Sequence, residues 1–159
     1  GSLLRGAGSD QEIIGKITKK TGIVATTTTT AVVEALRKLS LNRIALATPY
    51  SEPLHRKEVQ FLNQLGLEIV SMKNLGFESK QIRESPPSVA YRLARKVDRP
   101  DAEGVFISCT NFRTIEIIEQ LEHDLEKPII TSNQATLWKA LNTVRVREPI
   151  KGYGKLLET

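Results

Sequence analysis

Short runs of apolar residues, many of them β-branched, alternate along the chain with longer stretches in which apolar residues recur every three or four positions. The short runs are typical of buried strands and the longer stretches of amphipathic helices. The strand-like runs lie at residues 23–26, 44–47, 67–70, 104–107 and 128–130. Strands separated by helices in this order predict an α/β fold, with a doubly wound, mostly parallel, Rossmann-like sheet.

Helix boundaries are marked by capping and turn residues. Ser9 and Glu12 have the spacing of a capping box, and Gly22 offers a stop for the helix that they begin. Further helices are predicted after the threonines that end at Thr30, over 54–65, from the Ser85-Pro86-Pro87 entrance, directly beyond Asn111, and over about 133–141. The polar connection over 73–84 carries no clear pattern.

Length and composition describe an ordinary globular chain. Its 159 residues suit one domain or one lobe of a two-lobed protein, and 40% hydrophobic with 26% charged residues excludes disordered and disulfide-scaffold classes. No apolar run approaches the roughly 20 residues of a membrane span. One cysteine, Cys109, permits no internal disulfide, which suits a reducing compartment; we therefore expect a cytoplasmic protein with no membrane partner.

The net charge is +5, from 23 basic and 18 acidic side chains, and it is unevenly spread. Residues 73–100 are mostly basic, whereas residues 113–127 are mostly acidic. Nucleic-acid surfaces usually add stacking aromatics or a recognisable module, but aromatics are only 5% of this chain. We interpret the charges as solvated helix faces and expect no nucleic-acid partner.

Three polar segments directly follow strand-like runs, at residues 25–30, 48–50 and 108–111. Ligands of such sheets bind outside the carboxyl ends of the strands, so these segments are predicted to converge on one crevice. The threonines of the first segment suit either hydroxyl donors for an anion or simple helix capping.

Cys109 and Tyr50 are the strongest candidates for catalysis or ligand binding. A cysteine at a strand end, just before a helix, is placed to form a stabilised thiolate, although a lone cysteine beside an apolar strand is commonly a small buried hydrophobe. Tyr50 either aims its phenol at a ligand or is half-buried with a satisfied hydroxyl. His55 and His123 fall in charged helical stretches and are expected on the surface. No metal cluster, nucleotide loop or serine-histidine-acid pattern occurs, so we expect no metal and no cofactor.

Several collinear motifs carry a family resemblance. They are the stretch 21–36, Thr48-Pro49-Tyr50, Phe106-Ile107-Ser108-Cys109-Thr110-Asn111, the stretch 131–138, and Gly152-Tyr153-Gly154. Together they resemble the aspartate/glutamate racemase superfamily, within it the branch of maleate cis-trans isomerase and arylmalonate decarboxylase, and the match runs nearly from end to end.

The resemblance implies two pseudo-symmetric α/β lobes with the active site between them, and cysteine chemistry without metal or organic cofactor. Cys109 matches the downstream catalytic cysteine, and Tyr50 matches a tyrosine that binds the substrate carboxylate. Thr110 and Asn111 belong to the loop that presents amides and polar groups to the substrate. The implied partner is a small dicarboxylate. The implied activity is a maleate-isomerase-like isomerisation; an arylmalonate-decarboxylase-like or racemase-like enzyme, or a catalytically inactive lobe, stays open.

Domain organisation also follows from the resemblance. Residues 1–6 are similar to the segment just downstream of the family's first cysteine motif, which the 159 residues do not contain. We therefore expect residues 1–20 to be a remnant of the first lobe, residues 21–131 to be a complete second lobe, and residues 132–159 to return to the first lobe. The two flanking segments are expected to pack loosely or to pair with another copy, as a homo-oligomer. No role is carried onto residues 76–80, which lack the asparagine usual there.

Overall fold

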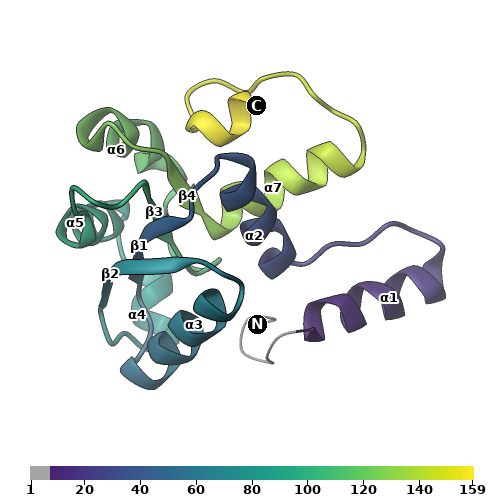
Figure 1. Ribbon diagram of the computed structural model, residues 1–159, viewed down its shortest axis with the longest axis horizontal. Helices are drawn as coiled ribbons and strands as arrows, with labels where there is room; N and C mark the ends of the chain where they lie inside the picture. Colours follow the sequence, from purple (N-terminus) through teal and green to yellow (C-terminus); the bar gives the residue numbers. More distant parts are fainter. Residues whose placement is uncertain (1–7) are drawn as a thin grey trace.

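The computed structural model describes residues 8–159, and its centre is a parallel sheet of four strands. The strands run in the order β2 (Glu68–Asn74), β1 (Arg43–Thr48), β3 (Gly104–Ile107) and β4 (Ile129–Thr131). Helices cover both faces of the sheet (Figure 1). The predicted doubly wound α/β fold is therefore confirmed.

Seven α-helices and two short 3₁₀ turns connect and flank these strands within residues 8–159. The elements are α1 (Ser9–Thr21), α2 (Thr28–Lys38), α3 (Glu52–Gln64), α4 (Ser79–Glu84), α5 (Pro87–Val97), η2 (Ile115–Ile117), α6 (Ile118–Leu125), α7 (Ser132–Thr143) and η3 (Lys155–Glu158). No helix of the described part has both the length and the apolar content that crossing a membrane requires.

The core has two halves because side chains of a strand alternate between the faces of the sheet. Ile44 and Leu46 of β1 face α2, α3 and α7, whereas Ala45 and Ala47 face α5 and α6. Both sets are fully buried. The near-continuous apolar strands that the sequence displays follow from this coverage, since a parallel sheet is buried on both faces.

The fifth predicted strand, at residues 23–26, is not formed. This segment is an irregular connection between α1 and α2, and Ile23 and Val24 are 67% and 70% exposed. Branched side chains favour extended backbone, but a strand also needs a neighbour to pair with. None of the described strands lies beside these residues.

Helix α7 and the end of the chain are part of the core, which corrects the expectation that residues 132–159 pack loosely, although residues 144–149 between them are exposed. Helix α7 lies along α2, joined by an ion pair of 2.6 Å between Lys139 and Glu34. Leu156 and Leu157 are buried in the same cluster as Leu36. Apolar side chains at these positions drive the segment onto the sheet.

Helix α1 differs from the C-terminal segment, because none of its residues is buried. Most of it projects from the body of the protein, and only its first turn touches α2, where the Thr30 hydroxyl donates to Asp10 at 2.7 Å (Figure 1). The assignment of residues 1–20 and 132–159 to a second lobe stays a prediction, and residues 1–7 lie outside the described part.

Candidate active site

The ends of β1 and β3 bring Tyr50 and Cys109 to one edge of the sheet. The two strands are parallel neighbours, with Ala47 opposite Ile107, so the loops that follow them emerge side by side. Tyr50, Cys109, Thr110 and Asn111 line one open pocket of about 790 Å³. The structure thus places together all four residues that the sequence nominated.

The Tyr50 loop is fixed by the segment that follows β2. The backbone amide of Gly76 donates to the carbonyl of Tyr50 at 3.0 Å, and Phe77 donates to Pro49 at 2.8 Å. The side-chain amide of Asn74 donates to the same Tyr50 carbonyl at 3.0 Å. These bonds hold the tyrosine backbone in place and make residues 76–80, with Phe77 and Lys80, a wall of the pocket.

Cys109 has a backbone conformation that L-residues rarely adopt, with φ of 104°. Such conformations cost about 1–3 kcal/mol and persist where the surroundings enforce them. Here the Cys109 amide donates to the hydroxyl of Ser132 at 3.1 Å, and the Asn133 side chain donates to the carbonyl of Thr110 at 3.1 Å. The first turn of α7 therefore holds the cysteine loop.

The helix expected directly beyond Asn111 begins later. Residues 110–114 are irregular, and the 3₁₀ turn η2 starts only at Ile115, ahead of α6. The thiol, which is half-buried, therefore does not lie at the first turn of α6. The helix-dipole argument for a stabilised thiolate consequently fails for that helix, since the effect fades within one turn.

Glu58 is the functional candidate that sequence reasoning missed. It lies in the middle of α3, is 1% exposed, and neither of its carboxylate oxygens has a hydrogen-bond partner in the described part of the protein. Burial raises the pKa of Glu58 to about 7. A signal was present in the sequence, because position 58 falls at helical spacing between Leu54 and Phe61, on the buried stripe of α3.

Tyr50 and Ser108 lie next to this carboxyl group. Burial raises the pKa of Tyr50, and negative charge on Glu58 and on Cys109 raises it further. The Ser108 hydroxyl is fully buried and adjoins both the Tyr50 hydroxyl and the Glu58 carboxyl, so that it lowers the pKa of each. Glu58, Ser108, Tyr50 and Cys109 therefore form one polar group at the carboxyl edge of the sheet.

His55 is not on the surface, which corrects the expectation from its charged neighbours. It is 2% exposed, and its Nδ1 lies 2.9 Å from the hydroxyl of Thr48 at the end of β1. Burial lowers the pKa of His55, so the ring is neutral at pH 7. His123, in contrast, is exposed as predicted.

The threonine segment does not join the Cys109 pocket. Thr27 caps α2, with its hydroxyl accepting a hydrogen bond from the Thr30 amide at 3.1 Å. Thr29 and Thr30 line a separate pocket beside α1 and α3. Of the two interpretations of this segment, helix capping is the one that the geometry supports.

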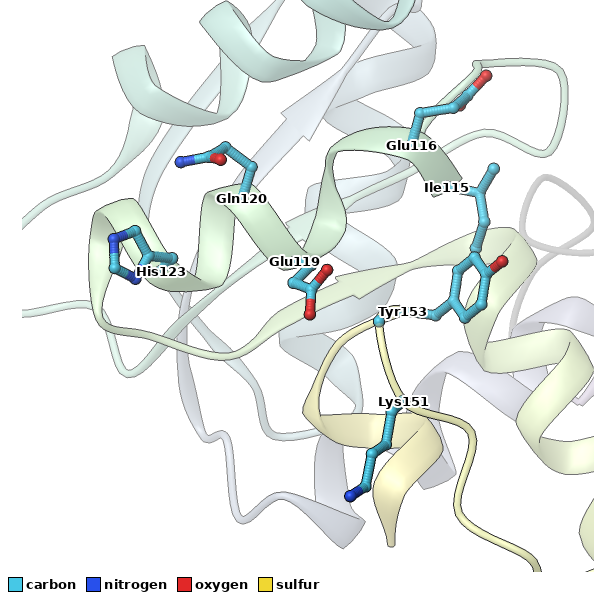
Figure 2. Close-up of a pocket in the computed structure, with 8 residues that line it drawn as sticks. Ile115, Glu116, Glu119, Gln120, His123, Lys151 and Tyr153 are labelled. Carbon is cyan, nitrogen blue, oxygen red and sulfur yellow. The ribbon is translucent and has the colours of Figure 1, made fainter.

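A third hollow, of about 840 Å³, lies between α6 and residues 151–153 and is lined mostly by polar side chains, among them Glu119, His123 and Tyr153 (Figure 2). It contains neither a thiol nor a strand end. Within residues 8–159, no group of histidine, cysteine and acidic side chains is arranged to hold a metal ion. The Cys109 pocket is therefore the candidate active site.

Comparison with known proteins identifies relatives that match most of the chain. A family model described as arylmalonate decarboxylase matches residues 1–157. The arylmalonate decarboxylase of Bordetella bronchiseptica is 28% identical over 161 residues, covering 99% of this chain and 67% of that protein. The maleate isomerase of Nocardia farcinica is 28% identical over 129 residues, covering 80% of this chain and 51% of that protein. The chain thus spans about two thirds of the first relative and about half of the second.

Solved structures show the same fold. A liganded arylmalonate decarboxylase variant superposes with a TM-score of 0.91 at 27% identity, covering 98% of this chain and 68% of the other. The maleate cis-trans isomerase of Nocardia farcinica bound to TRIS superposes with a TM-score of 0.94 at 22% identity, covering 99% and 67%.

Proposed function

The chain belongs to the arylmalonate decarboxylase family, and from this premise we propose that it supplies Cys109 as the reacting group of a cofactor-independent enzyme for a small dicarboxylate. The finer proposal is cis-trans isomerisation of a maleate-like substrate. The observation that carries the proposal is the pairing of Cys109, held at φ of 104°, with Tyr50 in one pocket at the carboxyl edge of the sheet.

The pocket offers suitable partners for carboxylate groups. Thr110 and Asn111 are exposed at its rim, and Lys80 contributes a positive charge from the facing wall. The raised pKa of Tyr50 keeps its hydroxyl protonated at pH 7, so it remains a hydrogen-bond donor. Leu54, Phe77 and Ile82 supply an apolar surface for the carbon skeleton.

In the isomerisation, the thiolate of Cys109 adds to one carbon of the double bond. The π electrons move onto the adjacent carbon and its carboxylate as an enediolate, which hydrogen-bond donors such as Tyr50 stabilise. Rotation about the resulting single bond follows. The electrons then re-form the double bond and expel the thiolate, so that the enzyme is regenerated with no net proton exchange.

Decarboxylation of an arylmalonate is the second candidate, supported by the family model and by the 28% identity to the Bordetella bronchiseptica enzyme. In that reaction loss of CO₂ leaves an enediolate, and the Cys109 thiol donates its proton to the α-carbon. Water then returns a proton to the thiolate. The two candidates therefore differ in whether solvent hydrogen enters the product.

The test is an NMR assay in D₂O of the polypeptide encoded by the gene, with maleate and with phenylmalonate. Isomerisation yields fumarate without deuterium, whereas decarboxylation yields phenylacetate with one deuterium at the α-carbon. We expect fumarate, and we expect Cys109→Ala to lower the rate at least about 100-fold. A Leu137→Ala variant, altered at an exposed position of α7, serves as the control. Turnover that survives Cys109→Ala would overturn the proposal.

The number of thiols leads to a further expectation. Two-cysteine chemistry places one reacting group on each face of the substrate, whereas these 159 residues contain one thiol. We therefore expect the 159-residue chain by itself to turn over maleate far more slowly than any polypeptide that adds a second such group. Equal rates would show that one face suffices.

A further inference from the structure

Glu58 is a buried carboxyl group that the proposed chemistry does not use. Its two oxygens lack hydrogen-bond partners within residues 8–159, and no ion pair there includes it. A buried polar group without a partner costs roughly 1–3 kcal/mol, so an apolar residue would serve the core of α3 better. The position of Glu58, behind the Tyr50 and Cys109 pair, therefore calls for a functional explanation.

The Ser108 hydroxyl links this carboxyl to the pocket. Its Oγ is buried and has no partner of normal hydrogen-bond geometry, yet it lies close enough to Glu58 and to Tyr50 to lower the pKa of each. Tyr50 in turn adjoins Cys109. A serine hydroxyl both donates and accepts, and its hydrogen rotates to suit its neighbours. The direction of donation along these four side chains is therefore free to reverse.

We propose that Glu58 is a positioning residue that acts through Ser108 to set the direction in which the Tyr50 hydroxyl donates its hydrogen. With Glu58 protonated, its carboxyl hydrogen is donated to Ser108, and Ser108 donates to the Tyr50 oxygen. The tyrosine hydrogen then points to Cys109 and the pocket. It stabilises the thiolate and, on the function proposed above, a substrate carboxylate.

Ionisation of Glu58 reverses this order. A carboxylate only accepts hydrogen bonds, so Ser108 donates to Glu58 and accepts from Tyr50. The tyrosine then presents a lone pair to the pocket, where it opposes negative charge on Cys109. The structure thus contains a switch that favours the reactive state while Glu58 is protonated and weakens it as Glu58 ionises.

Within residues 8–159, few other charges act on this carboxyl. On α3 itself His55 is neutral and bonded to Thr48, whereas Glu52, Arg56 and Lys57 are exposed to solvent. Across the sheet edge the titratable groups are Tyr50 and Cys109. The charged side chains on the elements that pack around α3 are exposed, are paired, or line other pockets; they are Asp10, Glu34, Arg37, Glu68, Lys73 and Lys80.

The single cysteine makes a direct test possible. Iodoacetamide alkylation of the chain reports Cys109 alone, and it requires no substrate. Glu58→Gln keeps a hydrogen-bond donor toward Ser108 at every pH and so imitates the protonated carboxyl. We expect equal alkylation rates for the two proteins at pH 5.5. At pH 8 we expect the variant to react about fivefold faster, the equivalent of one hydrogen bond of about 1 kcal/mol.

Two variants separate this mechanism from a general effect. In the Tyr50→Phe background, which has no hydroxyl to redirect, Glu58→Gln is expected to leave the pH 8 rate unchanged. A fivefold gain that persists in that background would overturn the proposal, because the carboxylate would then act without Tyr50. Glu52→Gln, at an exposed position of the same helix, is the matched control and is expected to behave as wild type.

A second measurement keeps the proposal testable should Glu58→Gln fail to fold. Carbon-13 NMR of the wild-type protein follows ionisation of the Glu58 carboxyl directly. The alkylation rate of a simple thiol rises with pH as the thiolate forms. The Cys109 rate must fall below that rise at the pH that is the midpoint of the Glu58 titration. Separate midpoints would overturn the proposal. Because alkylation uses no substrate, failure of the proposed isomerase activity leaves this test intact, and the two failures are distinguishable.

Discussion

Glu58→Gln should also change how the stability of the protein depends on pH. The pKa of Glu58 is raised from 4.5 to about 7 by burial, which means that the folded state binds the proton more tightly than the unfolded state does. Linkage then requires a stability contribution that is fully present below about pH 4.5 and is lost as pH rises through about 7. Glutamine does not titrate, so the variant does not lose this unfolding free energy as the pH rises.

The magnitude follows from the two pKa values. A shift from 4.5 to about 7 corresponds to about 3 kcal/mol of unfolding free energy, at roughly 1.36 kcal/mol per pKa unit. The group is almost completely buried, so solvent screens little of this cost. About 2 kcal/mol of the loss has accumulated by pH 6, and almost all of it is present by pH 8.

The assay is urea denaturation at pH 5, 6, 7 and 8, followed by the fluorescence of Trp138, the single tryptophan. The stability of Glu58→Gln relative to wild type should improve by about 2 to 3 kcal/mol between pH 5 and pH 8. Glu52→Gln provides the reference, and its profile should run parallel to that of wild type. A stability difference between Glu58→Gln and wild type that is the same at all four pH values would refute the reasoning.

Three further substitutions test other parts of the structure. Thr27→Ala removes the cap of α2 and should lower the unfolding free energy by about 1 kcal/mol, measured by urea denaturation. Gly154→Ala should cost about 2 to 4 kcal/mol, seen as a lowered Tm, because Gly154 has φ of 86° and a Cβ there would lie 2.4 Å from Ile118. Ser132→Ala leaves the amide of Cys109 without its acceptor, so we expect a loss of about 1 kcal/mol and a several-fold change in Cys109 alkylation; wild-type values for both would show that α7 does not hold the loop.

An apolar run in the sequence correctly predicted a strand where another strand lies beside it in the structure to pair with. The runs at 44–47 and 104–107 became β1 and β3, whose side chains are buried on both faces. The run at 23–26 has similar residues but pairs with no described strand, and a local pattern does not report the presence of a partner. The packing of residues 132–159 could not be predicted for the same reason, because burial of Leu156 depends on contacts with residues that are distant in sequence.

Part of the candidate site followed from topology. Parallel strands end at one edge, which is sufficient to place Tyr50 beside Cys109. His55 was expected on the surface because of its charged neighbours, and Glu58 was not considered, although its spacing places it on the buried stripe of α3. The hydrogen bond of His55 to Thr48 and the contact of Glu58 with Ser108 join residues from separate elements, so helical spacing can indicate burial but not these contacts.

At Cys109 the left-handed backbone lowers the stability of the protein, whereas the proposed chemistry requires the thiol at this position. Glycine adopts φ near 104° without steric cost, whereas any other residue pays for it. In a lineage released from the need for a thiol, exchange of this residue for glycine would relieve the backbone strain, so selection for stability would favour the exchange. On the function proposed above, residue 109 is therefore the position at which we expect loss of that function to show first in the sequence of a descendant.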